Sequence, residues 1–227
     1  RIQPPAFAGR SITEKLALIR EAMAGRQADG LILSALDEIA WTLNLRGTDV
    51  HCTPVFVAYT WITPSLCTLY INKVKVTEEV STHLEECGVE TRNYTDILPD
   101  LSRFDGKRIW TDCQTTNYAL CRSLPETCSV VDAASPVSLL KAVKHPAEVE
   151  GYRRAMLRDG VAMVKFLKWL TPAVQAGGQT ELGISRKLEE LRSEQDLFCG
   201  NSFDTIAGYA AHGAIVHYEP TPETDLE

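Results

Sequence analysis

The spacing of apolar residues predicts alternating helices and strands over roughly the first 135 residues. Apolar side chains from Ile12 to Met23 recur at intervals of four, three and four residues, which places them on one face of a helix. Ser11 and Glu14 stand where a capping box would begin this helix, each side chain bonding the backbone of the other residue. The short apolar run at 30–34 then predicts a buried strand.

The rest of this region continues the alternation. Pro64 and Ser65 separate two β-prone runs and predict a hairpin turn. Alternation of this kind indicates an α/β layer around a largely buried sheet. We expect helices over 37–45, 77–87 and 116–123, and strands over 54–63, 66–71, 107–111 and 129–132.

The pattern changes near Ser135 and Pro136. Pro146 suits the first turn of a long helix, because its missing N–H needs no partner there. We expect this helix to continue to about Trp169, and a second helix, capped by Thr180, to run to about residue 195. Two strands, at 203–207 and 214–218, are expected around a loop of small residues.

Composition narrows the class of protein. The formal net charge is −7, which argues against a surface for nucleic acids or anionic membranes. No apolar run approaches the ~20 residues that cross a bilayer. Seven cysteines, an odd number without C-x-x-C spacing, argue against a disulfide framework or a structural zinc site. We therefore expect mostly buried thiols in a soluble cytoplasmic protein.

The residues by themselves give a weak catalytic signal. His217 interrupts a β-branched run, a pattern more typical of a core histidine bonded to a backbone carbonyl. His212 lies in a glycine-flanked loop, where a solvated histidine is the simpler interpretation. Arg46 could bind a carboxylate through its guanidinium fork or form a structural salt bridge. Asp204 would be a buried carboxylate within the strand expected at 203–207.

Four separated segments together resemble aminopeptidase P, of the creatinase/pita-bread metallopeptidase superfamily. They occur in family order and span nearly the whole chain, and the stretch from 74 to 131 adds little. The segments are SALDEIAW at 34–41 with NLRGTD at 44–49, KAVK at 141–144 with EVEG at 148–151, FCGNSFDTIAG at 198–208, and HGAIVHY at 212–218.

The resemblance implies two domains and a chemistry. Residues 1–138 would form a creatinase-type α/β domain, a mixed sheet flanked by helices, and 139–227 the first part of an α+β pita-bread domain. Family members remove the N-terminal residue from peptides with proline in second position. They use two divalent ions, typically manganese, held by two Asp, one His and two Glu. Those ligands are expected beyond residue 227, so none is assigned here, and residues 1–227 alone are expected to be inactive.

The resemblance also assigns individual residues. His217 matches a family histidine that bonds substrate and moves protons near the metals, which reverses the interpretation from pattern alone. His212 matches a substrate contact of some members, and Arg46 lies in a motif that would face the substrate cleft or a partner subunit. Ala210-Ala211 stand where members often have Gly-Pro. The resemblance further implies a homodimer.

Two alternatives remain open from the sequence. The same fold occurs in non-catalytic modules that bind peptides or proteins, and in related hydrolases such as prolidase or creatinase. The presence or loss of the five metal ligands would separate an enzyme from a binding module.

Overall fold

The computed structural model describes residues 1–227, and they form two compact units. The first unit comprises Arg1–Val50 and Pro54–Glu148, and the second comprises His51–Thr53 and Val149–Glu227. The boundary expected from the sequence, between residues 138 and 139, falls inside helix α7 (Pro136–Ala142). That boundary stays a prediction.

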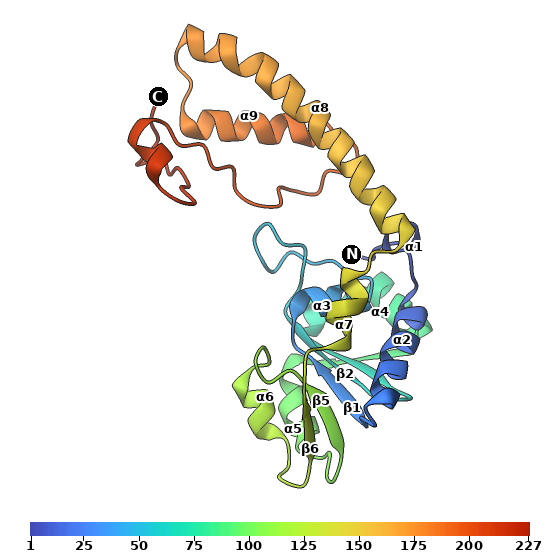
Figure 1. Ribbon diagram of the computed structural model, residues 1–227. Coiled ribbons are helices and arrows are strands. Elements are labelled where there is room, and N and C mark those ends of the chain that lie inside the picture. The colour runs from blue at the N-terminus through green and yellow to red at the C-terminus, as the bar shows by residue number, and fades with distance from the viewer. The chain divides into compact units, whose positions relative to one another are not determined.

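A six-stranded mixed sheet forms the centre of the first unit (Figure 1). Its order is β4-β3-β2-β1-β5-β6. The β2 strand pairs antiparallel with β1 and β3, whereas β1 with β5, β5 with β6, and β3 with β4 are parallel. The strands are β1 (Gly30–Leu33), β2 (Ala58–Ile62), β3 (Cys67–Ile71), β4 (Val89–Asn93), β5 (Arg108–Thr111) and β6 (Ser129–Asp132).

Helices cover both faces of the sheet, so strands β1 and β3 are buried throughout (Figure 1). Alternate side chains of β1 enter different cores: Leu31 and Leu33 pack in one, Ile32 in the other. The first core includes α2 (Ile12–Gly25), α3 (Leu36–Thr42), α4 (Glu78–Glu86) and α7; the second includes α5 (Ile97–Leu101) and α6 (Tyr118–Ser123). Shorter elements are α1 (Pro5–Ala8), η1 (Lys73–Lys75) and η2 (Tyr94–Asp96).

Most expected elements of this unit are confirmed. The capping box at the start of α2 is present, because Ser11 Oγ accepts from Glu14 N and Ser11 N donates to the Glu14 carboxylate. The expected turn at Pro64 joins β2 to β3 as an antiparallel hairpin. The mixed sheet flanked by helices is therefore as predicted. Strand β4 was not expected, because its sequence, VETRN, is largely polar.

Gly30 lets the backbone of β1 pass close to the indole of Trp61. A Cβ atom at position 30 would overlap that ring, which is buried and stacks on Phe104 with centroids 4.4 Å apart. We expect Gly30→Ala to lower the free energy of unfolding by about 1–3 kcal/mol, the usual effect of overpacking. Urea unfolding followed by tryptophan fluorescence measures the change.

A matched glycine substitution controls for this test. Gly25, at the end of α2, has nothing within 4 Å of the position that a Cβ would take. Because alanine favours helix over glycine, Gly25→Ala should leave stability unchanged or raise it by up to ~1 kcal/mol. Equal midpoints for the two variants would contradict the close approach at Gly30.

The second unit is built on two helices that pack along one another (Figure 1). Ala162 and Phe166 of α8 (Pro146–Ala176) form a small core with Leu188 and Leu191 of α9 (Glu181–Ser193). The α8 helix runs past Trp169, its expected end, and contains Pro172. No helix in the structure combines the length and apolar character needed to span a membrane.

The prediction of two strands, at 203–207 and 214–218, is wrong. The structure has no strand there, and only η3 (Ala210–Ala214), a 3-10 helix, interrupts irregular backbone. A strand needs a neighbour to pair its N–H and C=O groups, and none lies beside these segments in the described chain. Asp204 is accordingly part of a loop rather than of a strand.

The expectation of mostly buried thiols is also wrong. None of the seven cysteines forms a disulfide in the structure, and Cys67 alone is buried; Cys113 and Cys199 are exposed and the other four are half-buried. The sheet's interior is filled by larger apolar residues, so most thiols lie at element ends and loops.

Candidate active-site segment

The N-terminus of α9 holds the end of the chain in place. Thr180 caps the helix, since its Oγ1 accepts from Gly183 N at 3.1 Å. Glu181 N donates to Leu226 O at 3.0 Å, and Leu182 N donates to Asp225 Oδ1 at 3.0 Å. The first-turn amides, which have no partner within a helix, thereby bind the segment at 225–226.

Glu181 organises the residues between η3 and the end of the chain. Its carboxylate is buried, and it accepts from Tyr209 N at 2.6 Å, His212 Nδ1 at 3.0 Å and Tyr218 Oη at 2.9 Å. It also accepts from Leu226 N at 3.3 Å. Burial raises the pKa of Glu181, but these hydrogen bonds outweigh burial and lower the pKa to about 2. The carboxylate is therefore ionised at neutral pH.

His212 contacts both Glu181 and Tyr218 in this cluster. An ionised carboxylate only accepts hydrogen bonds, so Nδ1 of His212 is the protonated ring nitrogen and donates a hydrogen bond to Glu181. The imidazole also packs on the ring of Tyr218, with centroids 4.4 Å apart. His212 lies in the 3-10 helix η3 rather than in the loop expected for it, and its side chain is half-buried and held rather than freely solvated.

His217 is exposed, and the adjacent Tyr218 is buried. The backbone of His217 is left-handed, with φ of 53°. The His217 side chain makes no hydrogen bond or ion pair in the structure. A core histidine bonded to a carbonyl, the interpretation from pattern alone, is not what the fold contains. The imidazole is available to an external group.

Arg46 belongs to the first unit and has intramolecular partners. Its Nη1 donates to the carbonyl oxygens of Ala40 at 3.1 Å and Leu45 at 2.8 Å, and the side chain is half-buried. The neighbouring Asn44 has φ of 49° and donates to Arg10 O at 2.8 Å. These contacts show that the segment at 44–46 helps to hold its own loop.

Lys15 is a buried charge that the sequence reasoning missed. Its Nζ donates to Trp41 O at 2.7 Å and to Asn44 Oδ1 at 2.5 Å, and it lies 4.1 Å from the centre of the Trp41 ring. Burial lowers the pKa of Lys15 to about 8, with smaller contributions from the cations Arg46 and Arg10. The signal was present, because Lys15 falls on the apolar face between Ile12 and Ile19.

Three possible metal ligands meet elsewhere in the second unit: His51, Cys52 and Asp204. The hydrogen bond with Asp204 raises the pKa of His51. Burial raises the pKa of the Cys52 thiol, and the charge of Asp204 raises it further. The described residues hold no cluster of two Asp, one His and two Glu, so the dinuclear centre that the resemblance implies has no ligand set among them.

Comparison with known protein families covers nearly the whole chain. The creatinase/prolidase N-terminal domain matches residues 1–148, and metallopeptidase family M24 matches residues 150–227. A probable Xaa-Pro aminopeptidase P of Sclerotinia sclerotiorum is 38% identical over 226 residues, which are 95% of this chain and 38% of that protein. Aminopeptidase P1 of Arabidopsis thaliana is 35% identical over 274 aligned positions, covering 100% of this chain and 42% of its own.

A solved structure is similar over the same range. The X-prolyl aminopeptidase of Caenorhabditis elegans, a cytosolic enzyme with a di-nuclear active site, superimposes with a TM-score of 0.92 and 28% identity. The match covers 99% of this chain and 38% of that protein. The chain thus spans less than half the length of these relatives.

Proposed function

Because the chain belongs to the creatinase/prolidase N-terminal domain family and continues into a metallopeptidase M24 domain, we propose that it is part of a metal-dependent aminopeptidase. The substrates would be peptides with proline in second position, and the bond hydrolysed would be the N-terminal Xaa-Pro bond. The observation that carries this proposal is the identity of 38% and 35% to two aminopeptidases P over 95% and 100% of the chain.

In this proposal His217 is the catalytic residue that the chain contributes. Its imidazole is exposed, makes no internal hydrogen bond, and is set beside an anchored tyrosine. A neutral imidazole can accept or donate a proton near physiological pH, the task of a general acid or base at a scissile peptide. Two divalent ions, which we propose to be manganese, would supply Lewis acidity and an activated water. Their ligands are not among the described residues, so residues 1–227 alone should lack activity.

Two further assignments stay predictions. His212 would contact substrate through Nε2, because Nδ1 is engaged by Glu181. Arg46 would contact substrate or a partner subunit, although its Nη1 already serves backbone carbonyls. We also propose a homodimer and a cytoplasmic location. Exposed large apolar side chains on α8 support the homodimer: Met156, Leu157 and Val164. The cytosolic relative from C. elegans supports the cytoplasmic location.

The test of this function uses the longer protein that contains residues 1–227. Loaded with manganese, it should release free arginine from an Arg-Pro-Pro peptide, and amino-acid analysis measures the product. An Arg-Ala-Pro peptide is the matched control and should remain intact. No release from Arg-Pro-Pro, with bound metal confirmed, would overturn the enzyme in favour of a binding module. Cleavage of Xaa-Pro dipeptides alone would indicate a prolidase.

A further inference from the structure

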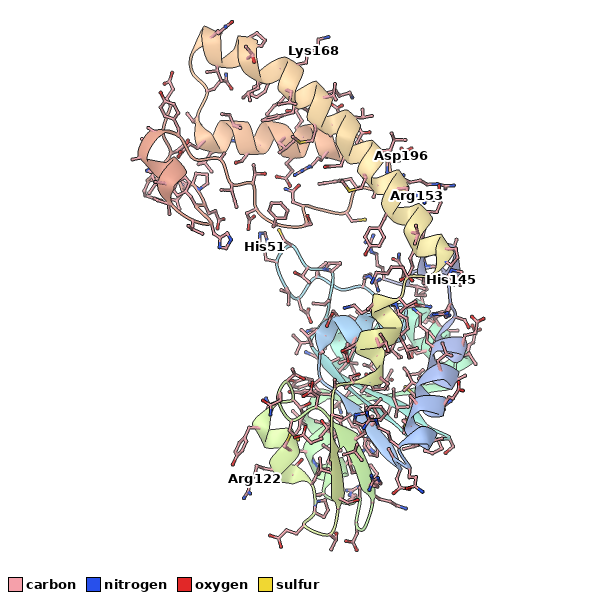
Figure 2. All side chains as sticks on the ribbon, in the orientation of Figure 1. His51, Arg122, His145, Arg153, Lys168 and Asp196 are labelled. Atoms are coloured by element: carbon pink, nitrogen blue, oxygen red, sulfur yellow. The ribbon has the colours of Figure 1, made fainter.

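A histidine, a thiol and a carboxylate meet at the end of a loop in the second unit. Figure 2 shows His51 at the tip of this loop. Its Nε2 lies 2.8 and 3.0 Å from the two carboxylate oxygens of Asp204, and 3.4 Å from Cys52 Sγ. Cys52 Sγ is 4.0 Å from Asp204 Oδ1. These donors converge although Asp204 lies far from the other two in sequence.

The separations of these donors suit a small tetrahedral cation. Zinc bonds nitrogen and oxygen at about 2.0–2.2 Å and sulfur at about 2.3 Å, so tetrahedral ligands stand about 3.3–3.6 Å apart. The His51–Cys52 separation of 3.4 Å falls within that range, whereas the His51–Asp204 separation of 2.8 Å lies below it and the Cys52–Asp204 separation of 4.0 Å lies above it. Shifts of less than about 1 Å in exposed side chains would therefore form a three-ligand site.

The exposure of the His51 and Asp204 side chains makes such a shift easy. Cys52 has a left-handed φ of 55°, which turns the chain so that the side chains of two successive residues reach the same carboxylate. The His51 side chain is 77% exposed and that of Asp204 is 44% exposed, so neither is locked by packing. The fourth position of the cation would remain open to water.

The donor set selects the class of metal. A thiolate and an imidazole favour zinc or similar thiophilic ions, whereas magnesium, calcium and manganese prefer all-oxygen sites. The charges of Glu189 and Glu219 also reach Cys52, and they add negative potential where a cation would lie. Binding would release the Cys52 thiol proton to solvent, because the thiolate is the ligand.

We propose that His51, Cys52 and Asp204 form a binding site for one thiophilic divalent cation, zinc in particular. The cation would replace the His51–Asp204 hydrogen bond with two coordinate bonds and would add a third to Cys52. It would thereby fasten the loop at 51–53 to the loop that carries Asp204. This site does not depend on the proposed peptidase function.

Cobalt titration of the reduced, metal-free chain of residues 1–227 tests the proposal. A cobalt–thiolate charge-transfer band should develop with one equivalent per chain, and added zinc should abolish it. Cys52→Ser should eliminate the band. His51→Gln and Asp204→Asn should each weaken binding by at least about tenfold, since loss of even an outer partner of a metal ligand has that effect.

Other exposed thiols provide the controls. Cys199→Ser and Cys113→Ser should keep the band and the affinity of the unchanged chain. Circular dichroism of each variant checks that the fold is intact. A band that survives Cys52→Ser would overturn the site. Equal affinity in His51→Gln and Asp204→Asn would also overturn it, because an adventitious ion on a lone thiol would then explain the signal.

Discussion

Replacing His217 by alanine in the longer protein should lower kcat by ~10²–10⁴-fold, the usual contribution of a positioned proton-transfer group. The exposed imidazole has no internal hydrogen bond in the structure, so its removal leaves no buried group unsatisfied and should barely change stability. The loss should therefore appear in catalysis. Steady-state kinetics on an Arg-Pro-Pro peptide, with metal content measured for each preparation, gives the value.

Two further variants separate proton transfer from a general effect of losing a histidine. His217→Gln keeps a polar side chain but cannot exchange a proton near neutral pH, so its kcat should fall like that of the alanine variant. His83→Ala removes a histidine from α4 in the first unit and should leave kcat close to that of the unchanged enzyme. A near-normal kcat for His217→Ala would return His217 to the structural histidines.

Local signals in the sequence were sufficient for most of the first unit. The capping box at Ser11 and the turn at Pro64 each depend on residues a few positions apart, and both appear in the structure. The long helix α8 was likewise visible in its spacing, although its end was not. Pro172 lies inside α8, yet the helix continues to Ala176 because a proline disrupts a single turn that neighbouring turns can support.

Elements that depend on distant partners were not predictable. The polar strand β4 exists because β3 offers it a parallel partner, from Cys67↔Val89 to Ile71↔Asn93. Conversely, the β-branched run ending at Val216 forms no strand, because no neighbour pairs with it. Residue preference alone cannot decide between these outcomes, since cross-strand packing dominates strand stability.

In the candidate site, too, features with a local sequence signal were predictable and features that depend on distant partners were not. The HGAIVHY segment identified His217 and His212 through its resemblance, but no local pattern linked either to Glu181, which is 31 residues from His212. In sequence Glu181 reads as an ordinary acidic residue at a helix start. Its burial, and its bonds to four donors, follow from the return of the chain to the N-terminus of α9. The cluster of His51, Cys52 and Asp204 arises similarly from contact across 152 residues or more.

The segment held by Glu181 should loosen in acid, and the pKa of Glu181 should set the pH range of the change. Hydrogen bonds lower its pKa from 4.5 to about 2 despite burial. Between those values the unfolded segment binds more protons than the folded one, so stability falls as pH falls. The contribution is fully present above about pH 4.5 and is lost progressively toward pH 2. Amide resonances of Tyr209 and Leu226, recorded by NMR over that range, should report the loss.

Substituting glutamine tests whether the carboxylate is the cause. Glu181→Gln has no charge to titrate, so the segment should already be weakened at pH 6 and should show little further change between pH 4.5 and 2. Glu189→Gln, at an exposed position on the same helix, should behave like the unchanged protein. If the Glu181→Gln segment instead loosened with the original acid midpoint, another group would have to hold the end of the chain. His212 and Tyr218 would then owe their positions to that group.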